Sequence, residues 1–354
     1  MKNDVSVRCG RYALRVGRVR RRALICRTAG RIAAAIISLI LMLMPLVGCA
    51  ARTGGASETE ISIVATIFPP YDFARAVAGG TDGKVDIRML LPPGSESHDY
   101  EPTVADIAEI AECDLFICVG GETDRWVDGV MDAVGHSVRM LRLTDMTELL
   151  AEDDSGIVDG MHGHEHDDGD GHGDGAEADE HVWTSPAIAA HITSVICDAM
   201  CDIAPQYADS FRTSAEAYMT RLRDIDCRLV AAARDGGTLI FADRFPFRYL
   251  THELGLDYRA AFAGCSSDSE PSLTAIYRLS EEARETGARV ILKGEFADPA
   301  AAGLIADACG AHVMTLHSCH NVTREDFESG VTYAQLMEEN LEVIRIALGL
   351  DAAL

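Results

Sequence analysis

The feature that most constrains the fold is a long helical pattern from Pro205 to Arg234. Its apolar side chains recur at helical spacing: Tyr207, Phe211, Ala215, Tyr218, Leu222, Ile225 and Leu229. At about 1.5 Å per residue such a helix is roughly 45 Å long, which is enough to cross a whole domain. A second helix is predicted from Pro186 to about Ile203, because proline favours the first helical position. We therefore expect linker helices over residues 186–235.

Strand-like and helix-like segments alternate on both sides of these linker helices. The predicted strands are Ile61–Phe68, Val85–Leu90, Leu115–Val119, Val138–Leu143, Thr238–Phe241, Tyr258–Phe262, Val290–Lys293 and His312–Leu316. Alternation of this kind predicts parallel sheets covered by helices on both faces. With 354 residues and 48% hydrophobic residues, the chain is expected to form two α/β lobes, over residues 61–185 and 236–354.

The N-terminus has the order of a secretory signal. Residues 1–31 hold 10 Lys and Arg against one acid, and an apolar run follows from Ile32 to about Val47. The end of this run, Leu46-Val47-Gly48-Cys49, resembles a bacterial lipobox, which predicts a signal peptide over 1–48 and a lipid anchor at Cys49. An uncleaved membrane anchor is the alternative. In both cases the rest of the chain, beginning with a tether over 49–60, is predicted to be extracytoplasmic.

The remaining chain is strongly acidic. The net charge of the whole chain is −25, and without residues 1–31 the balance is 21 basic to 55 acidic residues. This excludes nucleic-acid binding and favours attraction of cations. The segment 152–180 is the extreme case, because it contains four histidines among carboxylates and has no Lys or Arg. We interpret it as a loose surface loop that gathers metal, with a plain acidic linker as the alternative.

Four candidate metal ligands follow predicted strands or precede the linker helices. His98 follows the second strand, Asp243 and His317 follow strands in the second half, and His181 leads into Pro186. In open α/β sheets, ligands bind outside the carboxyl ends of the strands. These four side chains are therefore expected to face one cleft between the lobes.

The chain resembles the zinc- and manganese-binding receptor lipoproteins of bacterial ABC importers over roughly Ile61 to Leu350. Leu91-Pro92-Pro93-Gly94-Ser95-Glu96-Ser97-His98 and Asp179-Glu180-His181-Val182-Trp183 are similar to the segments that supply that family's first two histidine ligands. The acidic, His-rich insert is typical of its zinc-importing members. The resemblance implies two Rossmann-like lobes joined by a rigid linker helix, with the metal held between them.

Two positions depart from the pattern of that family. Where it has a third histidine, this chain has Asp243-Arg244, and arginine has no lone pair to give a metal. Where it has a final aspartate, this chain has His317. We therefore predict His98, His181 and His317 as ligands, with Asp243 as the fourth. Glu295, His320, Cys265 or water are alternatives for that place.

The function implied by the resemblance is an extracytoplasmic, non-enzymatic receptor, expected to be a monomer, that delivers Zn²⁺ to an ABC permease. Three nitrogens with one oxygen suit zinc better than Mn²⁺. The alternatives are a manganese receptor, a zinc-dependent hydrolase (although no HExxH occurs) and a surface adhesin. A disulfide between Cys265 and Cys319, both in loops near the predicted cleft, is also hypothesised.

Overall fold

The computed structural model describes residues 59–97, 100–135, 138–158, 178–264 and 270–350. All of them belong to one compact unit, Ser57–Leu354. The predicted signal peptide, Cys49, His98, Cys265 and most of the His-rich segment lie outside the described residues. What the sequence predicts for these parts therefore stays a prediction.

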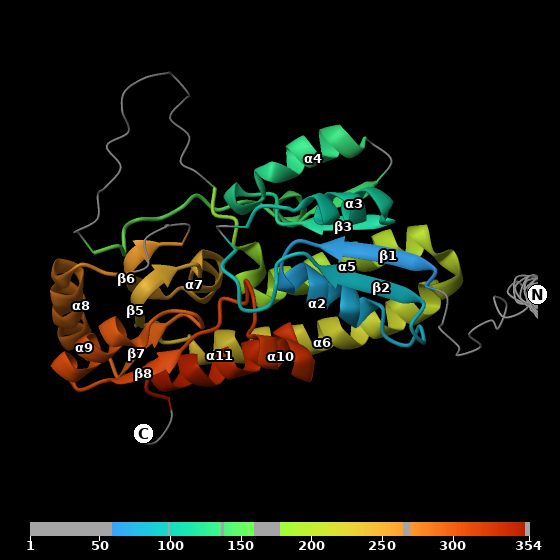
Figure 1. Cartoon of the computed structure of the whole chain (residues 1–354). Helices are drawn as coiled ribbons and strands as arrows, with labels where there is room; N and C mark the ends of the chain where they lie inside the picture. Colours follow the sequence, from blue (N-terminus) through green and yellow to red (C-terminus); the bar gives the residue numbers. More distant parts are fainter. Residues whose placement is uncertain (1–58, 98–99, 136–137, 159–177, 265–269, 351–354) are drawn as a thin grey trace, which may run out of the picture. The chain divides into compact units, whose positions relative to one another are not determined.

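The N-terminal lobe is built on a four-stranded parallel sheet with the order β2-β1-β3-β4 (Figure 1). Its strands are β1 (Ile61–Ala65), β2 (Val85–Met89), β3 (Leu115–Cys118) and β4 (Arg139–Arg142). The helices of this lobe are α2 (Phe68–Val77), α3 (Val104–Glu112) and α4 (Trp126–Val134). All four residues of β3 are buried, as expected for a central strand covered on both faces. A capping box between Thr103 and Asp106 fixes the start of α3.

The C-terminal lobe repeats this topology with the strand order β6-β5-β7-β8. Its strands are β5 (Thr238–Phe245), β6 (Asp257–Ala263), β7 (Val290–Lys293) and β8 (His312–Thr315). Its helices are α7 (Arg248–Leu254), α8 (Leu273–Thr286), α9 (Pro299–Cys309), α10 (Arg324–Ser329) and α11 (Tyr333–Ala347). The two-lobed α/β fold is thus confirmed.

Strand β5 is longer than predicted because it contains a bulge. Phe241 pairs with Ala260 and Arg244 pairs with Phe262, so β5 has one more residue than β6 between these pairs. The extra residue lets the strand continue past Phe241 to Phe245. Asp243 therefore lies within the bulged strand and not in a loop after it, which corrects the expectation from sequence. Bulges of this kind re-aim side chains near functional sites.

The linker consists of α5 (Pro186–Ile203), the short η4 (Pro205–Tyr207) and α6 (Ala208–Ala232). Helix α6 has 25 residues and is therefore roughly 37 Å long at about 1.5 Å per residue. It packs against α5 and α2 of the first half and against α11 and α7 of the second. Its buried side chains belong to one continuous apolar core that also includes residues of both sheets. This shared core joins the two lobes.

A buried carboxylate ties three of these helices together. Asp72 of α2 accepts hydrogen bonds from the hydroxyl of Tyr218 on α6, at 2.7 Å, and from the backbone N–H of Tyr333 at the start of α11, at 2.8 Å. Arg75 forms an ion pair with the same carboxylate. Burial raises the pKa of Asp72, although Arg75 and these donors oppose the shift. These contacts, which we call the Asp72 hub, therefore fix elements of both lobes to the linker helix.

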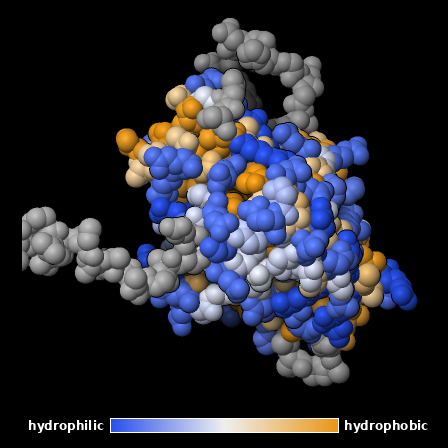
Figure 2. Space-filling view, turned by 90° about the vertical axis from the view of Figure 1, so that its right-hand side faces the viewer, coloured by the Kyte–Doolittle hydropathy of each residue, from blue (hydrophilic) through white to orange (hydrophobic). Residues whose placement is uncertain are grey.

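The outer surface differs from this interior. Figure 2 shows a face that is mostly hydrophilic, with separate hydrophobic areas. Helix α5 is long and apolar enough to cross a membrane, but ten of its residues are buried in the protein. Helix α5 is therefore a core helix of the protein, as its packing against α6 also indicates.

Candidate metal site

His181 is fully buried immediately before the short helix η3 (Val182–Thr184). The side chain of Asp179 contacts both the backbone and the ring of His181. Oδ1 of Asp179 accepts from the backbone N–H of His181 at 2.8 Å and lies 3.1 Å from Nδ1 of the ring. Tyr249 of α7 in turn donates to the carbonyl oxygen of Asp179 at 2.7 Å. The other ring nitrogen, Nε2, has no hydrogen-bond partner within the part of the chain that the structure describes.

The carboxylates around His181 favour positive charge at the ring even though the ring is buried. Burial lowers the pKa of His181, but the charge and hydrogen bond of Asp179 and the charges of Glu180 and Glu152 together raise it by more, so this pKa lies above its ordinary value. A bound cation would meet the same attraction as a proton. His181 is therefore a buried nitrogen donor in an anionic setting.

His320, in the loop that follows β8, lies directly against His181. The two ring centroids are 4.7 Å apart and the rings meet edge to face. Trp183 contacts both rings, with centroid distances of 5.5 Å to His181 and 4.9 Å to His320. Its indole N–H donates to the carbonyl oxygen of Ser318 at 2.9 Å, which fixes the two segments to each other.

Asp243 and His320 line the same cavity, which has a volume of about 300 Å³. The Oδ2 atom of Asp243 accepts from the backbone N–H of Gly294 at 2.8 Å, whereas Oδ1 has no partner among the described residues. Burial raises the pKa of Asp243 to about 6. At the same cavity Arg244 and Glu96 form an ion pair between the C-terminal and N-terminal lobes at 3.3 Å. Asp243 therefore offers the cavity a carboxylate oxygen.

The side chain of His317 is directed elsewhere, although only two residues separate it from His320. Its Nε2 lies 3.4 Å from a carboxylate oxygen of Glu339 on α11. Its backbone N–H donates to the side chain of Asn340 at 2.7 Å, and Asn340 donates back to its carbonyl oxygen. The structure thus brings His320, and not His317, against His181.

The loop that leads to His98 is attached to the loop that carries His320. Asn321 donates to the carbonyl oxygens of Pro92 and Ser95, at 2.8 and 2.9 Å, and the N–H of Gly94 donates to the carbonyl oxygen of Val322 at 2.8 Å. Ser97, the last described residue before His98, is buried. Residues immediately before His98 are therefore held beside the candidate site.

Several residues that shape the site are not singled out by the sequence. Trp183 and Ser318 act through packing and a carbonyl oxygen, which leave no signature in a ligand pattern. Gly264 approaches His181 so closely that a Cβ built on it would lie 3.0 Å from Cε1 of the ring. Asp179 does have a signal, since an acid two residues before a candidate ligand can bond its other ring nitrogen.

Cys319 is a buried free thiol in the structure. This gives no support to the hypothesised disulfide with Cys265, which lies outside the described residues. The described side chains contain no cluster of three or more His, Cys, Asp or Glu that could hold a metal. The donors that the structure does show are Asp243 and His320, which line one cavity, and His181, whose ring lies against that of His320.

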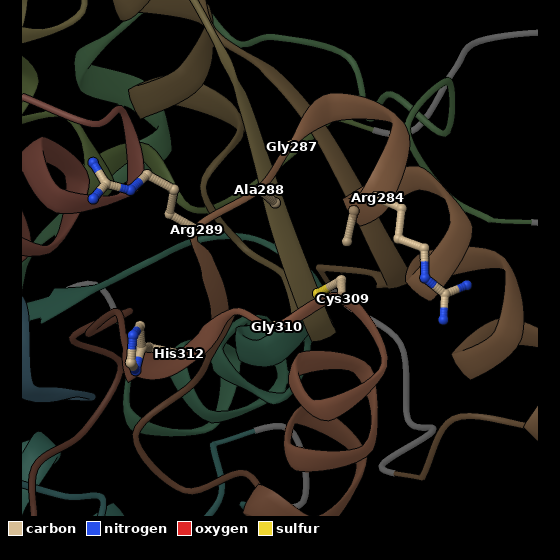
Figure 3. Close-up of a pocket in the computed structure, with 8 residues that line it drawn as sticks. Arg284, Gly287, Ala288, Arg289, Cys309, Gly310 and His312 are labelled. Atoms are coloured by element: carbon tan, nitrogen blue, oxygen red, sulfur yellow. The ribbon is translucent and has the colours of Figure 1, made fainter.

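A second hollow, of about 450 Å³, lies between the ends of α8 and α9 (Figure 3). Its two arginines, Arg284 and Arg289, point in opposite directions. Arg284 also donates to the carbonyl oxygen of Ala308 and forms an ion pair with Glu281. The guanidinium groups of the two arginines therefore do not converge on a common ligand.

A family model described as zinc-uptake complex component A, periplasmic (ZnuA), matches residues 63–347. Zinc-binding protein AdcA of Streptococcus pyogenes is 29% identical over 294 residues, which cover 82% of this chain and 56% of AdcA. The chain thus spans just over half the length of the AdcA relatives that it matches. The high-affinity zinc uptake system protein ZnuA of Bacillus subtilis is 29% identical over 320 residues, or 88% of this chain and 96% of ZnuA.

Among solved structures, the fold is similar to the Zn(II)-bound ZnuA-like domain of AdcA from Streptococcus pneumoniae. The TM-score is 0.66 at 26% sequence identity, and the match covers 82% of this chain and 99% of that domain. The similarity extends over both lobes and the linker helices.

Proposed function

We propose a zinc-receptor function on the premise that this chain belongs to the ZnuA family of zinc-uptake components, whose model covers residues 63–347. In this function the protein captures Zn²⁺ outside the cytoplasm and delivers it to an ABC permease. The observation that carries the proposal is the contact between His181 and His320, whose ring centroids are 4.7 Å apart. Paired neutral imidazoles are preferred zinc ligands.

The proposed ligands are His181, His320, His98 and Asp243. His320 takes the place that the sequence suggested for His317, because His317 is directed to Glu339 and His320 lies against His181. The supporting observation for His98 is the attachment of the preceding loop to Asn321. Oδ1 of Asp243 would supply the oxygen. Three nitrogens and one oxygen favour zinc over manganese, which prefers more oxygen ligands.

These residues must present lone pairs to the zinc ion and neutralise its charge. Asp179 accepts the Nδ1 proton of His181, which leaves the lone pair on Nε2 available. Burial excludes water from the ring. Because α6 and the Asp72 hub fix both lobes, we expect capture and release to require only small movements.

In the cell, Cys49 would carry a lipid that anchors the receptor to the membrane beside its permease. We expect the receptor to act as a monomer, since all the donors proposed belong to one chain. The acidic, His-rich segment would raise the local concentration of zinc. Each of these assignments extends the zinc-receptor proposal.

The proposal is tested by isothermal titration of Zn²⁺ and Mn²⁺ into the exported chain without its leader and lipid. Losing a proposed ligand should weaken zinc binding more than losing a residue that only supports a ligand, so we expect a loss of more than about 100-fold for His320→Ala. His317→Ala is the matched control and should bind zinc within about threefold of the parent protein. If His317→Ala loses binding and His320→Ala retains it, the ligand set proposed here is wrong.

A further inference from the structure

Glu295, in the turn after β7, accepts three hydrogen bonds from the loop that carries His320. Its Oε2 accepts from the backbone N–H of Ser318 at 2.9 Å. Its Oε1 accepts from the hydroxyl of Ser318 at 2.8 Å and from the backbone N–H of Cys319 at 3.1 Å. A carboxylate can only accept hydrogen bonds, so the single hydroxyl proton of Ser318 points toward Glu295.

This direction determines the next hydrogen bond. Oγ of Ser318 lies 2.9 Å from Nδ1 of His320. Because the hydroxyl proton is already donated to Glu295, Oγ can only accept from the ring, and Nδ1 of His320 must carry a proton. In the neutral ring the lone pair then lies on Nε2. Asp179 produces the same tautomer in His181 through a direct contact.

The backbone of this loop also depends on Glu295. Cys319 has φ of 63°, in the left-handed region that residues other than glycine rarely adopt. Such a conformation persists only where its surroundings hold it. The N–H groups of Ser318 and Cys319 are held by the two oxygens of Glu295. The carboxylate therefore fixes the loop from which the ring of His320 projects.

We propose that Glu295 and Ser318 are positioning residues that fix the tautomer and orientation of His320, and that Glu295 is not itself a metal ligand. This inference rests on the proposed zinc-receptor function. It assigns a role to a carboxylate that the sequence offers only as an alternative ligand.

The role is testable because glutamine at position 295 can donate as well as accept. In Glu295→Gln the amide can donate to Oγ of Ser318, which would turn the hydroxyl proton toward Nδ1 of His320. The ring would then shift to the tautomer protonated on Nε2. Ser318→Ala removes the hydroxyl that connects Glu295 to His320. The matched control is Ser280→Ala, which removes a buried hydroxyl elsewhere, on α8.

The first measurement is ¹⁵N NMR of histidine-labelled, metal-free protein, with His320 assigned by its loss in His320→Ala. We expect the parent protein and Ser280→Ala to show Nδ1 protonated and Nε2 unprotonated. Glu295→Gln and Ser318→Ala should lose this pattern while keeping the parent circular dichroism spectrum. A parent protein with Nε2 protonated, or a pattern unchanged by both variants, would overturn the inference.

The second measurement is zinc affinity in a double-mutant cycle. Supporting residues of this kind are worth about 10- to 100-fold in metal affinity. We expect each single variant to lose that much and Glu295→Gln/Ser318→Ala to lose less than the product of the two single losses, because both substitutions break the same connection to Nδ1 of His320. Single losses that multiply fully in the double variant would show that the two side chains act independently and would refute the inference. If the NMR pattern holds but the parent protein binds no zinc, the proposed function fails and the positioning role survives.

Discussion

The ring of His320 meets the ring of His181 edge to face, with their centroids 4.7 Å apart. His181 precedes the linker helices and His320 follows the last strand of the second sheet, so this contact exists only when both halves of the chain are folded together. Trp183 packs against both rings and donates to Ser318. The candidate site is thus part of the same interior that joins the lobes.

The carboxylate of Asp179 should matter for zinc binding although it is not a proposed ligand. In Asp179→Asn the side chain can still bond the His181 ring but loses its negative charge. We expect zinc affinity to fall about 10- to 100-fold, as is typical when a supporting hydrogen-bond partner is lost. Titration calorimetry checks this, with Asp198→Asn, an exposed acid on α5, as the control. Equal affinities of the two variants would contradict the role of Asp179.

Gly264 should tolerate no side chain. An added Cβ would lie 2.9 Å from the carbonyl oxygen of Phe245 and 3.0 Å from Cε1 of His181, closer than ordinary contacts allow. Because Cε1 lies between the two ring nitrogens, displacing it misaligns both. We expect Gly264→Ala to weaken zinc binding by about tenfold or more. Gly303→Ala, where a Cβ meets nothing within 4 Å, should bind zinc like the parent protein. Equal zinc affinities of Gly264→Ala and Gly303→Ala would refute the steric argument.

Asp124 should make stability depend on pH. Burial raises its pKa to about 6 in the folded protein, despite hydrogen bonds from the N–H groups of Val119 and Gly120. The unfolded value is about 3.9. Between these values the folded state binds more protons than the unfolded state, so this carboxyl's contribution to stability falls as pH rises from about 4 to 6 and is constant above that range.

The test compares urea unfolding of the parent protein and Asp124→Asn between pH 4 and 7. Asparagine keeps an acceptor for both N–H groups but does not ionise. Relative to this variant, the parent protein should lose about 2–3 kcal/mol of unfolding free energy across that range. A difference between the two proteins that does not change with pH would show that Asp124 ionises normally in the fold.

Leu222 tests the contribution of the linker helix to the shared core. It is fully buried on α6. Leu222→Ala should lower the free energy of unfolding by about 2–5 kcal/mol, because it leaves a cavity in the core. Val230, on the same helix, is 48% exposed, and Val230→Ala should change this free energy by less than about 0.5 kcal/mol. Denaturant unfolding of both variants decides whether α6 is a core element.

Most of the fold could be predicted from the sequence. All eight predicted strands are present, and helices α5 and α6 lie where the proline at 186 and the long apolar pattern indicate. The shortest helices, such as α4, α7 and α10, cannot be predicted in this way. They have only six to nine residues, and over such lengths helical periodicity is weak.

The candidate site could be predicted only in part, because loop geometry decides which of several nearby residues points inward. His181 is buried and Asp243 lines the cavity. His317 and His320 lie three positions apart after the same strand, and only His320 faces His181. The left-handed backbone at Cys319 and the bond between His317 and Asn340 turn one ring in and the other out. Neither feature has a local sequence signature. The bulge in β5 similarly depends on its pairing with β6.

The most direct test of the central claim is anomalous diffraction at the zinc edge from crystals of the zinc-loaded protein. The account predicts one zinc ion about 2.0–2.1 Å from Nε2 of both His181 and His320, with Asp243 in its coordination sphere and His317 still facing Glu339. A zinc ion bound to His317, or bound with neither His181 nor His320, would contradict it.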